Sequence, residues 1–130
     1  MQLDVFRDIL AKLRRVDAMA MAAGDLSKRS LLMRDGLSSD TTMEELIALG
    51  GVGDVLGTVI DAKGRPVDHP INERVIGIGI PDLADIPNVI LAAGGDHKVP
   101  VVSALLGLGL VNTFVTDEGT ARAVLAGAGA

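Results

Sequence analysis

Apolar residues near the start of the chain recur with the spacing of a helix. Leu3, Phe6, Leu10 and Leu13 follow one another at intervals of three or four residues, with charged residues between them. On a helix, this spacing places the apolar side chains along one stripe. The pattern therefore predicts an amphipathic helix at the N-terminus.

Longer apolar runs without polar alternation predict strands. Residues 16–24 and 88–95 are continuous runs of mostly small and branched apolar residues, and both end in glycine. Such runs are typical of strands that are buried on both faces. Further strands are expected at residues 55–60, 73–80 and 111–117, where Val, Ile or Phe are grouped between turn residues.

Predicted helices alternate with these strands. They cover residues 41–50, the short stretch 81–87 between two prolines, and residues 96–109 and 118–129. The second half of the chain thus alternates strand and helix. This order predicts an α/β fold with a mainly parallel sheet.

Start and stop signals mark some of the helix ends. Asp40 or Thr41 can cap the helix expected at residues 41–50, and Gly50 can end it. Pro81 suits the first position of the short helix that follows, because the N–H group that proline lacks has no partner there.

Composition narrows the range of functions. The 130 residues are 48% hydrophobic and 22% charged, the balance of one globular domain, and no apolar run approaches the ~20 residues that a membrane span needs. The net charge is -5, and Phe6 and Phe114 are the only aromatic residues. This chain is therefore a poor candidate for binding nucleic acid directly. We expect a cytoplasmic protein.

Metal and cofactor chemistry has no support in the sequence. The chain contains no cysteine, which excludes thiolate metal sites and disulfides. His69 and His97 have no carboxylate or second histidine at ligand spacing. We therefore expect no metal site and no cofactor.

The Gly-Gly-x-x-Lys corner is the first candidate site. Gly94 and Gly95 end a predicted strand, and Lys98 follows at the start of the next helix. Glycines let a ligand approach the backbone, and a helix start with a lysine favours an anion such as phosphate. His97 would then line the same pocket. The alternative is a tight turn in which Asp96 caps the helix and Lys98 is solvated, and the spacing leaves both interpretations open.

A second glycine-rich corner precedes the strand expected at residues 55–60. It includes Gly53 and Asp54, and it could present the Asp54 carboxylate to the hydroxyl groups of a sugar. The alternative is a glycine-rich turn with a solvated aspartate. Asp61, which comes just before a Lys-Gly pair, is expected to be a turn residue.

These same stretches resemble a known family. The resemblance lies in the stretches VDAMAMAAGDL, ALGGVGDVLGTVIDAKGRPVDHPINERVIGIGI and IPNVILAAGGDHKVPVVSALLGLGLVNTFVTDEGTARAVL. They are similar, in this order, to the effector-binding domain of SorC-family bacterial transcriptional regulators, which include the DeoR- and CggR-like repressors. The resemblance covers nearly the whole chain.

The resemblance implies a fold and a domain organisation. The fold would be a Rossmann-like, three-layer α/β domain of the NagB/RpiA/CoA-transferase-like group, with residues 1–130 as the C-terminal portion of the effector domain. Full-length relatives also carry a helix-turn-helix domain, which is not present here, so any contact with DNA would need a domain absent from this chain. Strands left unpaired in a partial domain would favour self-association into a homo-oligomer.

The resemblance also implies a ligand. Family members bind a phosphorylated sugar or sugar alcohol without turning it over, and their AGG-x-x-K motif contacts the phosphate. In this sequence that motif places Gly94, Gly95 and Lys98 at the phosphate, while Gly53 and Asp54 would line the sugar. Two alternatives stay open: a related sugar-phosphate isomerase-like enzyme with Asp54 as its base, and a dimerisation fragment that binds no ligand.

Overall fold

The computed structural model describes residues 2–32, 34 and 41–128. Its helices, in chain order, are α1 (Gln2–Leu13), α2 (Met43–Ala48), the 3-10 helices η2 (Pro70–Arg74), η3 (Ile80–Asp85) and η4 (Asp96–Lys98), α3 (Val99–Gly107) and α4 (Glu118–Ala128). In this part of the chain, no helix has the length and apolar character that crossing a membrane requires.

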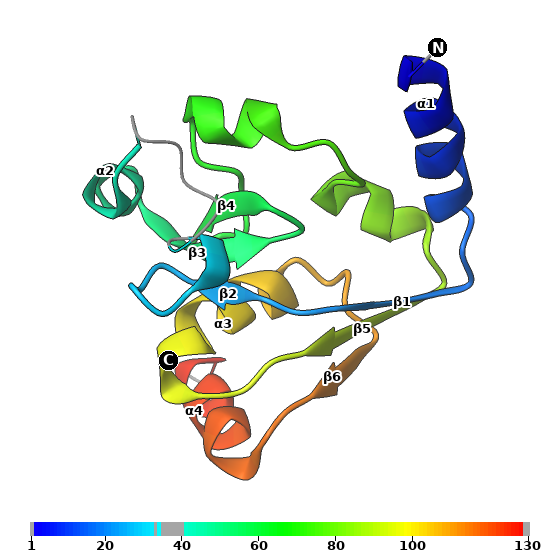
Figure 1. The fold of residues 1–130 in the computed structure, drawn as a ribbon. Coiled ribbons are helices and arrows are strands. Elements are labelled where there is room, and N and C mark those ends of the chain that lie inside the picture. The colour runs from blue at the N-terminus through cyan, green and yellow to red at the C-terminus, as the bar shows by residue number, and fades with distance from the viewer. Residues whose placement is uncertain (1, 33, 35–40, 129–130) are drawn as a thin grey trace.

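A parallel three-stranded sheet joins one strand from the first part of the chain to two strands from the second half. Its strands are β1 (Ala18–Met21), β5 (Asn88–Ala92) and β6 (Thr113–Val115), and they lie in the order β1-β5-β6. Helix α3 connects β5 to β6, and α4 follows β6 and packs against α3 (Figure 1). The predicted α/β fold with a parallel sheet is confirmed for this unit.

The core explains why the central strand was easy to predict. Val89 and Leu91 of β5 are completely buried, and they belong to the same apolar cluster as Val102 and Leu105 of α3. Strand β1 differs from the prediction of a buried strand, because only its last residue, Met21, is buried. The reason is its place at the edge of the sheet, where described residues cover it incompletely.

A second, antiparallel sheet was not predicted. It is formed by β2 (Gly24–Asp25), β3 (Gly51–Val55) and β4 (Thr58–Asp61), in that order. The sequence predicted a single strand at residues 55–60. The structure has a β-hairpin there, because the chain reverses between β3 and β4 at a two-residue turn.

The hairpin turn has the backbone conformation that joins antiparallel strands most tightly. Leu56 and Gly57 both have positive φ, of 53° and 79°, as in a turn of type I′. Such turns usually carry Asn or Gly at the first of these positions. Leucine there gave no turn signal in the sequence.

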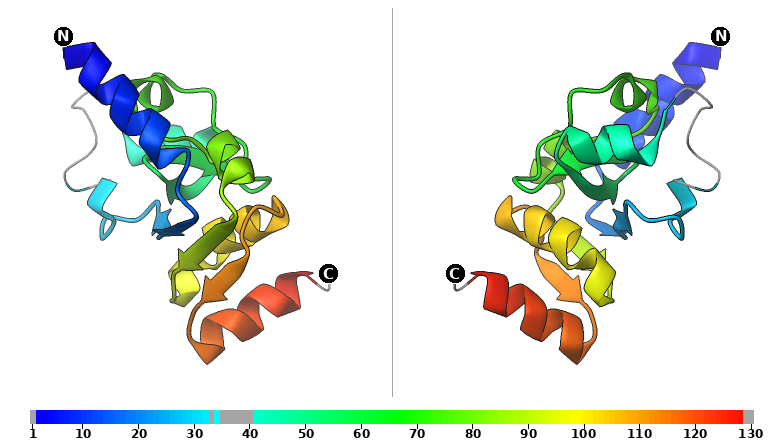
Figure 2. Two further views of the ribbon diagram at one scale, coloured as in Figure 1. Left: turned by 90° about the vertical axis from the view of Figure 1, so that its right-hand side faces the viewer. Right: turned by 90° about the vertical axis from the view of Figure 1, so that its left-hand side faces the viewer.

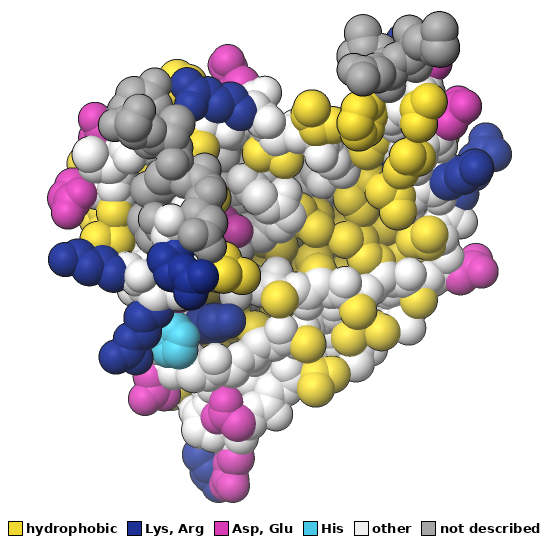
Figure 3. Space-filling view, in the orientation of Figure 1, with side chains coloured by type: hydrophobic (Ala, Val, Ile, Leu, Met, Phe, Trp, Pro, Cys, Tyr) yellow, Lys and Arg dark blue, Asp and Glu magenta, His cyan; other side chains and the backbone are white. Residues whose placement is uncertain are grey.

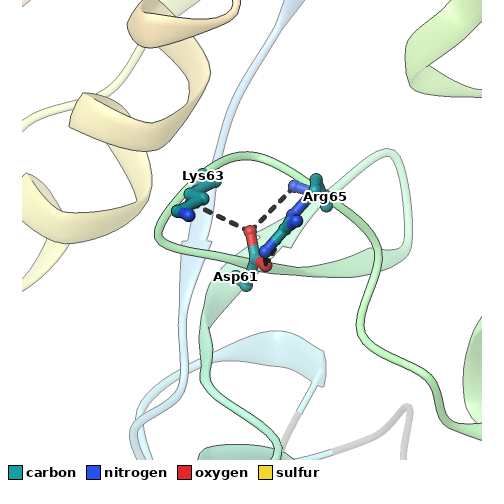
Figure 4. A network of polar contacts seen from close by, with 3 residues as sticks. All are labelled: Asp61, Lys63 and Arg65. Carbon is teal, nitrogen blue, oxygen red and sulfur yellow. Dashed lines mark hydrogen bonds and ion pairs between the residues drawn. The ribbon is translucent and has the colours of Figure 1, made fainter.

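A polar network closes the next turn, as expected for Asp61. Its carboxylate accepts the backbone N–H groups of Lys63 at 2.8 Å and of Arg65 at 3.0 Å, and Nε of Arg65 donates to it at 3.1 Å (Figure 4). These hydrogen bonds hold the pKa of Asp61 below its usual value. Asp61 is therefore a turn residue.

The strand predicted at residues 73–80 is wrong. This segment links η2 to η3 without strand structure, and Ile76 is 75% exposed while Ile78 is buried. A Cβ atom at Gly77 would meet nothing within 4 Å. The glycines here therefore do not mark a strand packed closely by another element. The short helix at Pro81 is confirmed as η3.

The N-cap of helix α2 lies one residue beyond Thr41, the later of the two expected caps. Thr42 is its N-cap: Oγ1 of Thr42 accepts the N–H of Glu45 at 3.2 Å, and the Glu45 carboxylate accepts the N–H of Thr42 at 2.9 Å. This reciprocal pair is a capping box. Thr41 is therefore not the cap, and Asp40 lies outside the described residues. Gly50, just beyond the helix, has φ of 86° and marks its end as predicted.

Helix α1 confirms the first prediction but extends away from the rest of the molecule (Figure 2). Its described apolar residues Val5, Phe6 and Ile9 are about half exposed. An ion pair anchors its end to η3: Nε of Arg14 lies 2.9 Å from Oδ1 of Asp82.

Candidate ligand-binding site

A cavity of about 420 Å³ lies where β2 and β3 meet the start of α3. Its size falls in the range of small-molecule sites. Its walls come from the end of β1 and the segment after it, from β3 and from η4. The lining residues are Ala22, Ala23, Gly24, Asp25, Arg29, Ser30, Leu31, Leu32, Asp54, His97 and Lys98.

Charged side chains of both signs line the cavity. Arg29 and Lys98 are cations, Asp25 and Asp54 are carboxylates, and His97 lies beside Lys98 on η4. Figure 3 shows Lys and Arg side chains gathered around a histidine on the left of the molecule. The cavity can therefore receive a ligand with an anionic end and a hydroxyl-bearing body.

Asp54 has a perturbed environment. Burial raises the pKa of its carboxyl group above the usual value, the negative charge of Asp25 raises it further, and the positive charge of Lys98 lowers it. The three side chains therefore act on one another electrostatically across the cavity.

Two glycines allow the Asp54 carboxylate to lie where it does. A Cβ atom at Gly24 would collide with Oδ1 of Asp54, and the two residues pair across β2 and β3. A Cβ atom at Gly53 would collide with the carbonyl oxygen of Gly24 and lie 2.6 Å from Cβ of Val101. Strands β2 and β3 and helix α3 thus approach one another because both positions are glycine.

Hydrogen bonds connect the corner formed by Gly94 and Gly95 to helix α4. The N–H of Gly95 donates to Oγ1 of Thr120 at 2.8 Å, and the Thr120 hydroxyl donates to Oδ2 of Asp117 at 2.7 Å. The N–H of Thr120 donates to Oδ1 of Asp117 at 2.8 Å. A Cβ atom at Gly94 would lie 2.5 Å from Oδ2 of Asp117. These hydrogen bonds hold the pKa of Asp117 below its usual value.

The start of α3 differs in detail from the expectation. The chain first forms the 3-10 helix η4, so Lys98 is the N-cap residue of α3 rather than a residue of its first turn. Asp96 is exposed, and neither η4 nor α3 has a side-chain cap. Gly95 has φ of 110°, and a Cβ atom there would meet Cε1 of His97 at 2.5 Å.

The predicted site residues thus separate into two groups. Asp54 lines one cavity together with His97 and Lys98, although it is more than 40 residues away from them in sequence. Gly53 does not line the cavity, but its missing side chain lets β3 pack closely against β2 and α3. Gly94 and Gly95 do not line the cavity either. The assignment of all six to a ligand stays a prediction.

The sequence analysis missed Asp25 and Arg29. Both fall in a stretch interpreted as an irregular loop, and the Lys28-Arg29 pair was interpreted as solvated charge, whereas Arg29 lines the cavity. Asp25 had one signal, because it directly follows a glycine at the end of an apolar run. Among the described residues, no group of three or more His, Asp or Glu side chains is placed to hold a metal ion.

Comparison with known families identifies the domain. Residues 1–126 match the family model Sugar-bind, which is described as "Putative sugar-binding domain". The chain belongs to this sugar-binding domain family. Together with the relatives described next, this match confirms the resemblance to the effector domains of transcriptional regulators.

Relatives of this sugar-binding domain are transcriptional regulators. The transcriptional regulator LsrR of Enterobacter sp. (strain 638) is 35% identical over 126 residues, which are 95% of this chain and 39% of the regulator. The erythritol catabolism regulatory protein EryD of Brucella abortus (strain 2308) is 30% identical over 111 residues, 85% of this chain and 35% of that protein. The chain therefore spans less than half the length of these curated relatives.

Solved structures share the fold. A DeoR family transcriptional regulator from Listeria monocytogenes matches 93% of this sugar-binding domain and 49% of its own chain, with a TM-score of 0.85 and 26% sequence identity. The mixed α/β architecture built on a parallel sheet is therefore that of regulator domains in this family.

Proposed function

We propose that this sugar-binding domain is the effector-sensing portion of a bacterial transcriptional regulator, and that its cavity binds a phosphorylated sugar or sugar alcohol. One observation carries the proposal: a single cavity brings Arg29 and Lys98 together with Asp25 and Asp54. A ligand with both phosphate and hydroxyl groups matches this set of charges. In a regulator, such a ligand acts by binding one state of the protein more tightly than another.

The cationic side chains would hold the phosphate. Lys98 lies at the start of α3, where the positive end of the helix dipole also favours an anion. Arg29 offers a planar, permanently charged group that suits phosphate oxygens. Because the N–H of Gly95 already donates to Thr120, we assign Gly94 and Gly95 mainly to the shape of the corner.

The carboxylates would bind the sugar. Asp54 accepts hydrogen bonds from hydroxyl groups, and the exposed His97 next to Lys98 contributes a further polar group at the cavity mouth. Gly53 acts indirectly, because its missing side chain lets β3 approach β2 and α3.

A thermal-shift panel tests this proposal. Phosphorylated hexoses, pentoses and sugar alcohols are added to the wild type and to Lys98→Ala, with the unphosphorylated sugars alongside. A ligand at about 100 times its Kd stabilises the fold by about 2.7 kcal/mol. We expect at least one phosphorylated compound to raise the melting temperature of the wild type but not of Lys98→Ala.

Lys63→Ala is the matched control, because Lys63 is an exposed lysine in the turn after β4 and does not line the cavity. It should respond to ligand as the wild type does. The proposal is wrong if no phosphorylated compound stabilises the wild type, or if Lys63→Ala and Lys98→Ala respond equally.

The isomerase-like alternative has one observation in its favour, the raised pKa of Asp54 in a cavity. The relatives are regulators, and we therefore propose that this domain binds its ligand without turnover. Incubation of each stabilising ligand with the protein, followed by chromatography of the small molecules, decides this. Conversion of an aldose phosphate to a ketose phosphate would support the enzyme.

We also propose that the chain self-associates. Val115 at one edge of the parallel sheet is 55% exposed, and Ala18 and Ala20 of the other edge strand are exposed as well. Figure 3 shows a broad apolar surface on the right of the molecule, on the side of α1. Sedimentation velocity at increasing concentration should give a species heavier than 13.4 kDa, and a monomer throughout would contradict self-association.

A further inference from the structure

Helix α1 carries an apolar stripe that its own domain leaves exposed. Four side chains form this stripe, and each is between 41% and 58% exposed: Val5, Phe6, Ile9 and Leu13. The helix contacts the domain along a neighbouring face, where Leu10 packs against the main apolar core and Arg14 pairs with Asp82. A row of large exposed apolar side chains along one helix is typical of an interaction surface.

The charges of α1 change sign along its length. Asp4 and Asp8 lie in the first part of the helix. Lys12 lies in its last turn, and Arg14 comes directly after the helix. Arg7 is the exception, and its Nη1 lies 3.7 Å from the carboxylate of Asp4 on the same helix. The helix thus has an acidic half and a basic half.

An element that covers the apolar stripe has to present an elongated apolar face with charges in the opposite order. A second copy of α1 does so when it lies antiparallel, because its basic half then faces the acidic half of the first copy. A parallel copy would place like charges side by side, which is unfavourable. Because α1 extends away from the rest of the molecule (Figure 2), a second copy can reach the stripe without displacing any described element.

Two charged residues beside the apolar stripe indicate how the copies would meet. Asp8 comes three residues after Val5, and Lys12 comes three residues after Ile9, so both lie along the same edge of the stripe. Both are exposed in the single copy. In an antiparallel pair with its two-fold axis near the middle of the stripe, this edge meets the same edge of the other copy. Asp8 of each chain then lies near Lys12 of the other.

We propose that α1 is a homodimerisation helix, which pairs antiparallel with α1 of a second copy of this chain and buries the apolar stripe between them. Two symmetric ion pairs between Asp8 and Lys12 select this orientation. The inference rests on the self-association proposed above, and it adds which surface associates and in which direction. The exposed edges of the parallel sheet are then not needed for the dimer.

Sedimentation equilibrium of charge-reversal variants tests the pairing. Asp8→Lys alone, or Lys12→Asp alone, turns both ion pairs into like-charge pairs, and each should raise the Kd of the dimer by about 5- to 30-fold at low salt. A one-to-one mixture of the two variants should associate with a Kd within about threefold of the wild-type value, because each chain then carries the charges that the other needs. A parallel pairing predicts no such recovery.

Lys63→Asp is the matched control, because Lys63 is an exposed lysine in the turn after β4, outside α1. It should associate as the wild type does. Ile9→Glu tests the apolar stripe itself, and the charge placed at its centre should raise the Kd of the dimer by about 30-fold or more. Far-UV circular dichroism of each variant should match that of the wild type, since the replaced side chains are exposed.

The outcomes separate this inference from the proposed self-association. If the wild type stays a monomer, both are wrong. If the wild type associates but Asp8→Lys, Lys12→Asp and their mixture all behave as Lys63→Asp does, the pairing through α1 is wrong and self-association through another surface stands. If each variant alone is weakened and the mixture does not recover, the antiparallel contact is wrong.

Discussion

Replacement of Thr120 by valine should destabilise the domain although the two side chains have nearly the same shape. Thr120 is completely buried, and its hydroxyl accepts the N–H of Gly95 at 2.8 Å while donating to Asp117 at 2.7 Å. Valine removes this hydroxyl and leaves the N–H of Gly95 without its partner. An unsatisfied buried donor costs about 1–3 kcal/mol, so we expect a loss of about 2 kcal/mol.

Urea unfolding followed by far-UV circular dichroism measures this loss. The chain contains no Trp or Tyr, so intrinsic fluorescence is a poor probe. Thr120→Ser is the matched control, because serine keeps the hydroxyl and removes one methyl group, worth about 0.8 kcal/mol. We expect the order of stability wild type, Thr120→Ser, Thr120→Val.

The pH dependence of the valine variant gives a second readout. Hydrogen bonds from the N–H and hydroxyl of Thr120 lower the pKa of Asp117. The ionised Asp117 carboxylate therefore stabilises the fold fully at pH values above its ordinary pKa of 3.8. This stabilisation is lost as the pH falls through the folded-state pKa. The difference between wild type and Thr120→Val should therefore shrink in acid. The reasoning is refuted if Thr120→Val is as stable as the wild type, or less affected than Thr120→Ser at neutral pH.

Two further predictions concern the cavity and its frame. Gly53→Ala should lower the free energy of unfolding by about 1–3 kcal/mol, because its Cβ would lie 2.6 Å from Val101. Gly77→Ala, whose Cβ would meet nothing within 4 Å, should be neutral or stabilising by up to about 1 kcal/mol in the same urea experiment. An equal loss of unfolding free energy in both variants would contradict the packing argument. The folded-state pKa of Asp54 is raised chiefly by burial. The stability that the protonated Asp54 side chain contributes is therefore complete below its ordinary pKa of 3.8, and it is lost as the pH rises through the folded-state pKa. The stability of the wild type relative to Asp54→Asn should therefore fall as the pH rises from about 3.5 to 7, and a flat difference would show that the pKa is not raised.

Elements with a continuous apolar signal could be predicted from the sequence. Strand β5 and helix α3 follow each other with a glycine pair between them, and both are buried at the positions that the pattern indicated. The parallel sheet could be inferred from that alternation, because buried strands joined by helices have few other arrangements. The family resemblance then added the ligand class, which no periodicity contains.

Elements that depend on a single backbone conformation could not be predicted. The hairpin between β3 and β4 turns at Leu56, a residue rarely found with positive φ. The alternation of isoleucine and glycine at residues 76–80 is also typical of a closely packed strand, but Ile76 is exposed and a Cβ atom at Gly77 would meet nothing within 4 Å. Tertiary contacts, rather than local pattern, decide such segments.

The candidate site also contains some residues that the sequence could predict and others that it could not. Lys98 could be found because a lysine after two glycines at a helix start has a chemical interpretation of its own. Asp25 and Arg29 have none in isolation. They become meaningful because the chain folds the end of β2 against β3, which brings two carboxylates and two cations to one cavity.

The glycines of the site support carboxylates more than they expose backbone donors. Gly24 gives room to the carboxylate of Asp54, and Gly94 gives room to that of Asp117, which holds the corner through Thr120. Since the N–H of Gly95 is already engaged by Thr120, attraction of an anion to this cavity rests chiefly on side-chain charge. The same arrangement explains why the sequence motif and the cavity lining coincide only in part: the glycines give room to neighbouring carboxylates, while the charged groups line the cavity.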